Sequence, residues 1–157
     1  MKRIFAVVLL TGFAAACGST SSMGPTGPTA QTAMTGTWAG SASDSSSSMG
    51  AGSLMGEAGM GTMTWPLTQS GTTVTGSMTF AGMTGRMPGV FTGTMSGDEM
   101  TFTMDMPMTS MMASGCTARA TGTARVDGTR RTMTGTYGGS NSCTGSFSNG
   151  QMTMTRR

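Results

Sequence analysis

The stretch MTFTMDMPM, Met100 to Met108, places Met or Phe at every second position and other residue types between them. The apolar set is Met100, Phe102, Met104, Met106 and Met108, and the intervening set is Thr101, Thr103, Asp105 and Pro107. Successive side chains of a β-strand point to opposite faces of a sheet. This spacing therefore predicts a strand with one buried face.

Four other segments follow the same period of two. Their apolar positions begin and end at Met63 and Leu67, Val74 and Phe80, Cys116 and Val126, and Met133 and Tyr137. Thr and Ser, with two arginines, fill most of the alternate positions. One rule obeyed by five independent segments predicts an all-β domain. With Thr35 to Ser43 and Cys143 to Arg156 included, we expect about eight strands.

Turn dipeptides separate most of these runs, which predicts hairpins and antiparallel neighbours. They are Ser70-Gly71, Gly97-Asp98, Asp127-Gly128 and Asn149-Gly150. A Thr-Gly-Thr or Thr-Gly-Ser unit also recurs inside predicted strands, at Gly36, Gly76, Gly93, Gly122, Gly135 and Gly145. Glycine permits sharp coiling and close approach of another backbone. The sequence thus predicts a small antiparallel meander barrel, which has no open edges, with a two-sheet β-sandwich as the alternative.

The first predicted strand contains Gly36-Thr37-Trp38, which resembles the Gly-x-Trp opening of calycins, the eight-stranded barrels that include lipocalins and avidins. In those families a basic residue on the last strand packs over the tryptophan, and Arg156 stands in a matching place. The resemblance implies a lipocalin-like barrel. It implies no particular ligand, because fold alone does not specify function.

The first sixteen residues are typical of an export signal, with Lys2 and Arg3 before an apolar run from Ile4 to Ala16. That run is shorter than the roughly 20 residues that cross a bilayer as a helix. We therefore predict a removable signal peptide over residues 1–16.

The end of this leader, Ala14-Ala15-Ala16-Cys17, resembles the lipobox of bacterial lipoproteins. The resemblance implies that Cys17 carries a diacylglyceryl thioether, becomes the N-terminus and is acylated, which tethers the protein to a membrane. Ordinary cleavage after Ala16 is the alternative, since Ala14-x-Ala16 fits that pattern as well. Pairing of Cys116 with Cys143 would leave Cys17 as the odd cysteine, which favours lipidation. Gly18 is not the Asp that often retains such proteins at the inner membrane, so the resemblance favours the outer membrane.

The rest of the chain is one domain in length. Residues 17–33 are mainly Ser, Thr, Gly and Pro and predict a flexible tether, which leaves 34–157 as the barrel domain. A Ser- and Gly-rich stretch from Asp44 to Gly61 predicts a long loop. After the leader, seven arginines face six carboxylates, a formal charge of +1. Nucleic acid is therefore not an expected partner.

The sequence contains few residues of the types that catalysis uses. The chain contains no His, and its one Lys lies in the leader, so triad, Schiff-base and Lys-dependent phosphate chemistry lack their residues. The carboxylates are scattered, and Asp98-Glu99 is predicted to be a solvated hairpin tip. We expect no catalytic residues, no cofactor and no enzymatic activity.

Cys116 and Cys143 predict a structural disulfide, because neither belongs to a Cys-x-x-Cys pair and exported proteins are oxidised. They open predicted strands that lie two apart, about 9.6 Å at the usual spacing, whereas a disulfide tolerates Cα separations of about 4.4 to 6.8 Å. The bridge is therefore expected beyond the end of the intervening ladder, through the loop Gly138 to Ser142. Its expected stabilisation is roughly 3 to 4 kcal/mol.

Two functions fit these features. The first is a binding or structural barrel for a small apolar ligand or a protein partner, because small inward residues leave room inside eight strands. Those residues are Gly76, Gly93, Ala118, Ala120, Gly122 and Ala124. The alternative is Cu(I) binding by Met104, Met106 and Met108 with Met111-Met112, since thioethers are soft ligands. The strand methionines also follow the buried parity and suit a core, so no metal-binding residue is assigned.

Overall fold

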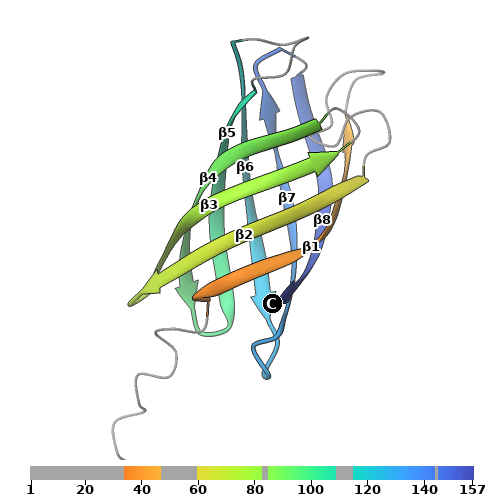
Figure 1. Cartoon of the computed structure of the whole chain (residues 1–157). Helices are drawn as coiled ribbons and strands as arrows, with labels where there is room; N and C mark the ends of the chain where they lie inside the picture. The colour runs from red at the N-terminus through yellow and green to blue at the C-terminus, as the bar shows by residue number, and fades with distance from the viewer. Residues whose placement is uncertain (1–33, 47–59, 83–84, 109–114, 144) are drawn as a thin grey trace, which may run out of the picture.

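The computed structural model describes residues 34–46, 60–82, 85–108, 115–143 and 145–157. These residues form one closed barrel of eight strands (Figure 1). The strands are β1 (Gly36–Ser46), β2 (Met60–Ser70), β3 (Thr73–Gly82), β4 (Gly85–Ser96), β5 (Glu99–Met108), β6 (Cys116–Val126), β7 (Thr132–Asn141) and β8 (Gly145–Arg156).

Each strand pairs antiparallel with the next one in the chain, and β8 pairs with β1 to close the barrel. Trp38 on β1 has two register partners, which are Trp65 on β2 and Arg156 on β8. The predicted meander barrel is thereby confirmed, and the alternative sandwich is wrong. Closure leaves no strand with an unpaired edge in this order.

The turns that join strands at the lower end of Figure 1 are short. Gly71 between β2 and β3 has φ +60°, and Gly97 between β4 and β5 has φ +64°. Only glycine adopts this left-handed conformation without a steric cost, so these residues allow two-residue hairpins. The connection between β6 and β7 is longer and contains Arg130 at φ +58°.

Several predicted boundaries are wrong. Strand β1 continues to Ser46 and β2 begins at Met60, so the ends of the predicted loop Asp44 to Gly61 belong to strands. Asn149-Gly150 does not form a hairpin, because β8 runs through it and pairs with β1 on both sides. Asn149 has φ +53°, and the registers shift here against both neighbours, so the dipeptide forms a β-bulge.

The inner face of the barrel alternates large and small side chains across neighbouring strands. One row across the sheet consists of Gly93, Phe102, Gly122, Tyr137 and Gly150, each opposite the next. A Cβ atom at Gly122 would lie 2.6 Å from Cζ of Phe102 and 2.9 Å from Cβ of Tyr137. The aromatic rings thus occupy the space that side chains at the glycines would need.

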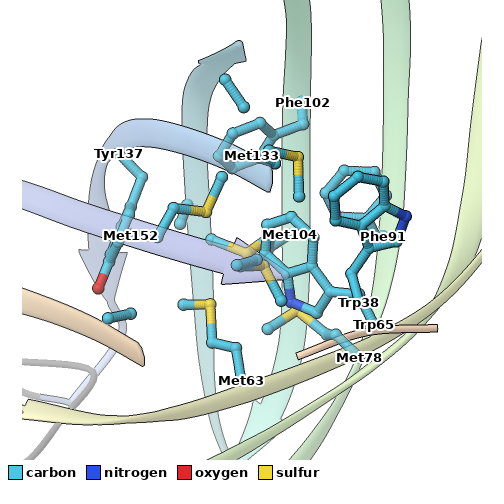
Figure 2. Close-up of a cluster of buried hydrophobic side chains, with 14 of the residues drawn as sticks. Trp38, Met63, Trp65, Met78, Phe91, Phe102, Met104, Met133, Tyr137 and Met152 are labelled. Carbon is cyan, nitrogen blue, oxygen red and sulfur yellow. The ribbon is translucent and has the colours of Figure 1, made fainter. Parts of the chain in front are cut away.

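Methionine supplies most of the large apolar side chains of the core. Eleven methionines are buried, namely Met34, Met63, Met78, Met87, Met95, Met100, Met104, Met106, Met133, Met152 and Met154. An aromatic group of Trp65, Phe91 and Phe102 lies among them, with centroids 4.6 to 5.7 Å apart (Figure 2). Unbranched thioether side chains adapt to irregular space, which suits an interior with such uneven neighbours.

The outer face is different, because threonine dominates it. Most threonines of the strands are exposed. Among the described residues, the exposed large apolar side chain is that of Val90, with an exposed fraction of 59%. The barrel is therefore apolar inside and hydroxyl-bearing outside. The described residues contain no helix that is long and apolar enough to cross a membrane.

One end of the barrel is closed by residues from the start and the end of the domain. Met34 is fully buried, its N–H donates to Oε1 of Gln69 at 3.0 Å, and its carbonyl accepts from Nε1 of Trp38 at 3.0 Å. Arg156 faces Trp38 in register, and its guanidinium donates to the Thr35 carbonyl. Because register partners share a face of the sheet, Arg156 lies on the same face as Trp38.

Candidate functional site

The barrel interior is the first place to look for a ligand, and its small residues do not leave the predicted room. A Cβ atom at Gly76 would lie 3.0 Å from Cδ2 of Leu67, and one at Gly93 would lie 3.1 Å from Sδ of Met100. Ala120 and Ala124 are opposite Met104 and Met100 and are themselves buried. At Gly76 the Pro66 carbonyl oxygen is closer still, so the neighbouring main chain and large side chains together occupy the volume.

The methionines of the copper hypothesis divide into two groups. Met104 and Met106 point inward from β5 and are buried, and Met108 ends the same strand opposite Cys116. Met111 and Met112 lie outside the described residues. Figure 2 shows Met63, Met104 and Met133 in the same cluster of buried side chains as Trp38 and Trp65. Nε1 of Trp65 is buried and has no hydrogen-bond partner among the described residues. Within the same residues, no group of three His, Cys, Asp or Glu side chains is placed to hold a metal ion.

Cys116 and Cys143 form the predicted disulfide, with Cα atoms 5.7 Å apart. The strand assignment behind the prediction is wrong, because β7 extends to Asn141 and Cys143 lies in the turn before β8. Ala118 pairs with Asn141, and Thr117 and Ser142 exchange hydrogen bonds of 2.9 and 3.0 Å. The cysteines are the next pair in this register, so the bridge joins adjacent segments beyond the ladder.

The acidic residues form structural contacts. Asp105 and Arg119 are register partners on the outer face, with an ion pair of 3.5 Å. The hydroxyl of Thr129, followed by the backbone N–H groups of Thr132 and Arg131, lowers the pKa of Asp127. Asp127 therefore organises the turn between β6 and β7. Asp98 lies in the turn before β5 and Glu99 begins β5.

Tyr137 is the one tyrosine of the chain and lies buried on β7. Its hydroxyl donates to the Ser43 carbonyl at 3.2 Å. Burial, and then the negative charge of Asp44 and a hydrogen bond to it, raise the pKa of Tyr137 above its usual value. The phenol is thus held neutral as a structural donor.

Two hollows on the described residues lie on the outside of the barrel, with volumes of about 580 and 490 Å³. The first extends from β3 to β6 and the second from β6 to β8, and they share Thr121, Gly122 and Thr123. We call the combined surface the threonine groove. Its lining is Thr73, Thr92, Gly93, Thr94, Thr101, Phe102, Thr103, Thr121, Gly122, Thr123, Thr136, Tyr137, Gly138, Asn149, Gly150 and Gln151.

Strand register explains the shape of the threonine groove. One wall follows the register partners Thr73, Thr94, Thr101, Thr123, Thr136 and Gln151. The opposite wall follows Thr92, Thr103, Thr121 and Gly138. Between the walls lie residues whose side chains point inward or are absent, so main chain forms the floor. Sequence reasoning missed this site, although repeated Thr-x-Thr units on successive strands carried its signal.

The predicted lipidation site, Cys17, lies outside the described residues, as does the predicted tether. No protein-family model, no curated protein and no solved structure matches this chain.

Proposed function

We propose that the chain is a lipid-anchored, non-enzymatic binding barrel of the cell envelope that holds its partner on the outer face. The observation that carries this proposal is the division between the two faces. Large side chains cover the inward glycines, whereas hollows of about 580 and 490 Å³ lie outside. Ligand sites usually occupy about 300 to 1,000 Å³.

Anchoring rests on the leader and on the cysteines. A disulfide between Cys116 and Cys143 indicates an oxidising compartment, which agrees with export. It also leaves Cys17 as the odd cysteine, available for acylation. A single acyl chain binds a membrane only marginally, but two or more anchor a protein stably. The proposed location is the cell envelope, with the outer membrane favoured by Gly18.

Fractionation of the full chain in a bacterial host tests the anchor. We expect the unaltered protein in the membrane fraction, and intact mass of the mature form should equal residues 17–157 plus the attached lipid. The Cys17→Ala variant should become soluble, while a variant with Cys116→Ala and Cys143→Ala should stay with membranes. Membrane retention of Cys17→Ala, or a mature form with an unmodified Cys17, would contradict the proposal.

Solvent extraction tests whether the interior carries a ligand. The barrel is purified without denaturation, extracted with organic solvent, and the extract is analysed by mass spectrometry after subtraction of a detergent-only control. We expect no apolar molecule at a stoichiometry near one per barrel. A stoichiometric apolar molecule would instead support an interior carrier of small apolar ligands.

Cu(I) binding is the second candidate, and the two buried thioethers of Met104 and Met106 on the inner face of β5 favour it. Titration under reducing conditions compares the unaltered protein with Met104→Leu, Met106→Leu and Met108→Leu combined. Leucine keeps similar volume and removes the sulfur, so loss of tight binding in this variant would support the copper site. Equal, weak binding by both proteins would remove it.

A further inference from the structure

Gly89 on β4 leaves inner space that two methionine side chains share. A Cβ atom at Gly89 would lie 2.7 Å from Cγ of Met106 on β5 and 2.9 Å from Cγ of Met78 on β3. The two side chains therefore converge on one position from opposite sides, and each sulfur is one bond beyond its Cγ. Both residues are buried, with exposed fractions of 1%. Thioethers from two strands that do not pair with each other thus come together over one glycine.

A third thioether belongs to β4 itself. Met87 precedes Gly89 by two residues, so it lies on the same face of the strand, and it is buried. Because Met78 pairs with Gly89 in the register, Met87 is the diagonal neighbour of Met78. Diagonal neighbours are about 7 to 8 Å apart, which is within reach of long side chains. We call Met78, Met87 and Met106 the thioether cluster.

The thioether cluster lies where the pairing between β4 and β5 stops. Their ladder ends at the pair Val90 and Asp105, one residue short of Met106, although both strands continue. Pro88 and Pro107 come next on the outer face, and proline has no N–H with which to extend a ladder. Local opening at this end therefore breaks no pairing between the two strands, which gives an ion access to the cluster.

The chemistry of the thioether cluster selects a soft monovalent cation. Thioethers are soft ligands that favour Cu(I), whereas Mg²⁺ and Ca²⁺ favour oxygen. The cluster contains no carboxylate, and without one a single positive charge costs less to bury than a double charge. The carboxylate of Asp105 lies on the outer face of β5, where it pairs with Arg119.

An ion of this kind needs no empty cavity. Heavy atoms in contact are about 3.5 to 4.0 Å apart, so the centre of three touching sulfurs lies about 2.0 to 2.3 Å from each. A metal–sulfur bond is about 2.3 Å long. Small rotations of unbranched methionine side chains are therefore enough to form a three-coordinate site within a packed core.

We propose that Met78, Met87 and Met106 bind Cu(I) over Gly89. This inference rests on the second candidate function, Cu(I) binding, and changes its ligands, because it takes one methionine from each of the strands β3, β4 and β5. It depends neither on the location of the protein in the cell nor on a partner on the outer face.

The test uses the full chain with Cys17→Ala in every protein, because a free thiol also binds Cu(I). Ascorbate keeps the copper reduced, and affinity is measured by competition with a chromophoric Cu(I) chelator. The test variant carries Met78→Leu and Met87→Leu and leaves the methionines of β5 in place. The control carries Met152→Leu and Met154→Leu, two methionines that are also buried, on β8.

Leucine keeps similar volume and removes the sulfur, and circular dichroism checks that each variant is folded. Loss even of a residue that only orients a ligand costs about 10- to 100-fold in metal affinity, so we expect a loss of at least about tenfold in the test variant. The control should bind as the unaltered protein does. Unchanged affinity in the test variant would overturn the assignment. Loss of binding on combined replacement of Met104, Met106 and Met108 would then retain Cu(I) binding on β5 alone, whereas weak binding by the unaltered protein would overturn both.

A second measurement needs no replacement in the thioether cluster. The protein is labelled with ¹³C at its methionine methyls and titrated with Ag(I), which is soft and monovalent like Cu(I). We expect shifts at Met78, Met87 and Met106 that saturate near one equivalent, and none at Met152 and Met154. Shifts confined to other methionines would overturn the site.

Discussion

Strand β5 has two faces that obey different rules. Its inner face carries Met100, Phe102, Met104 and Met106, and each of these is opposite a smaller residue on β6. Its outer face carries Thr101 and Thr103, and each of these is opposite another threonine on both neighbouring strands. Inside, therefore, side-chain size varies from strand to strand, whereas outside the same residue repeats.

The difference between the two faces shows which side chains folding requires and which positions it leaves free to vary. An interior packed at crystal-like density sets the size of each side chain by that of its neighbour. The outer face needs polar residues with good strand propensity, and threonine meets that need, although tyrosine and other polar residues would also be compatible with it. The inner face is therefore the one whose residue sizes are fixed by packing, and the outer face is the one whose residues are freer to change.

The largest effect is expected from Phe102→Ala. This change removes a ring that contacts Trp65 and Phe91 and covers Gly122, so unfolding free energy should fall by about 3 to 5 kcal/mol. Urea denaturation measures the loss. Thr101→Val on the other face of β5 serves as the control, with an expected change within about 0.5 kcal/mol. Similar losses at the two positions would contradict the division between faces.

Removal of the disulfide should have the next largest effect. The bridge closes a loop with a sequence separation of 27, which corresponds to about 3.5 kcal/mol in the chain-entropy model. The double variant Cys116→Ala and Cys143→Ala should lose about that amount in equilibrium unfolding. Addition of reductant to the unaltered protein should produce the same loss and none in the variant. Unchanged stability in both cases would show that the bridge adds nothing.

Gly122→Ala tests the complementarity of the inner row directly. The added Cβ would lie 2.6 Å from Cζ of Phe102, so we expect a loss of about 1 to 3 kcal/mol through overpacking. At Gly128, in the turn after β6, an added Cβ would meet nothing within 4 Å. Gly128→Ala should change stability by less than about 0.5 kcal/mol. A tolerant Gly122 would mean that space remains around Phe102 and Tyr137.

The smallest expected effect on stability at neutral pH is that of the ionisation of Tyr137. Its pKa is raised in the folded state, chiefly by burial, so the folded protein keeps the phenolic proton above pH 10 and the unfolded chain loses it. Stability is therefore unaffected below about pH 10 and falls as pH rises further. Absorbance of tyrosinate, from the one tyrosine of the chain, should appear together with loss of the β-sheet circular dichroism. Ionisation with the fold intact would contradict this.

Period-two patterns predicted the strands, their antiparallel order and the buried side of each. For a single residue such as Met104 or Thr103, its place in the alternation is enough to assign its side chain to the inner or the outer face. Boundaries were less accessible: Gly138 to Ser142 has the composition of a loop, but the register between Ala118 and Asn141 continues β7 through most of it. Asn149-Gly150 has turn residues, yet pairing of both flanks with β1 makes it a bulge.

The candidate site could not be predicted from the sequence, because it depends on which residues pair across neighbouring strands. The alternating pattern does not give this register. Gly93 and Gly122 indicated room inside the barrel, but Met100 lies against Gly93 and Phe102 lies against Gly122, and the sequence pattern does not reveal this. The same pairing aligns threonines of separate strands into the walls of one groove. The disulfide was predictable because three cysteines leave few alternative pairings.

The central claim, that side chains fill the barrel interior, can be tested by xenon binding. The protein is labelled with ¹³C at its methionine methyls, and spectra are recorded over a series of xenon pressures, because xenon enters empty apolar cavities. A filled interior predicts no saturable shift at the eleven buried methionines. Saturable shifts at Met104 and Met133, beside the aromatic group, would reveal a cavity and contradict the account.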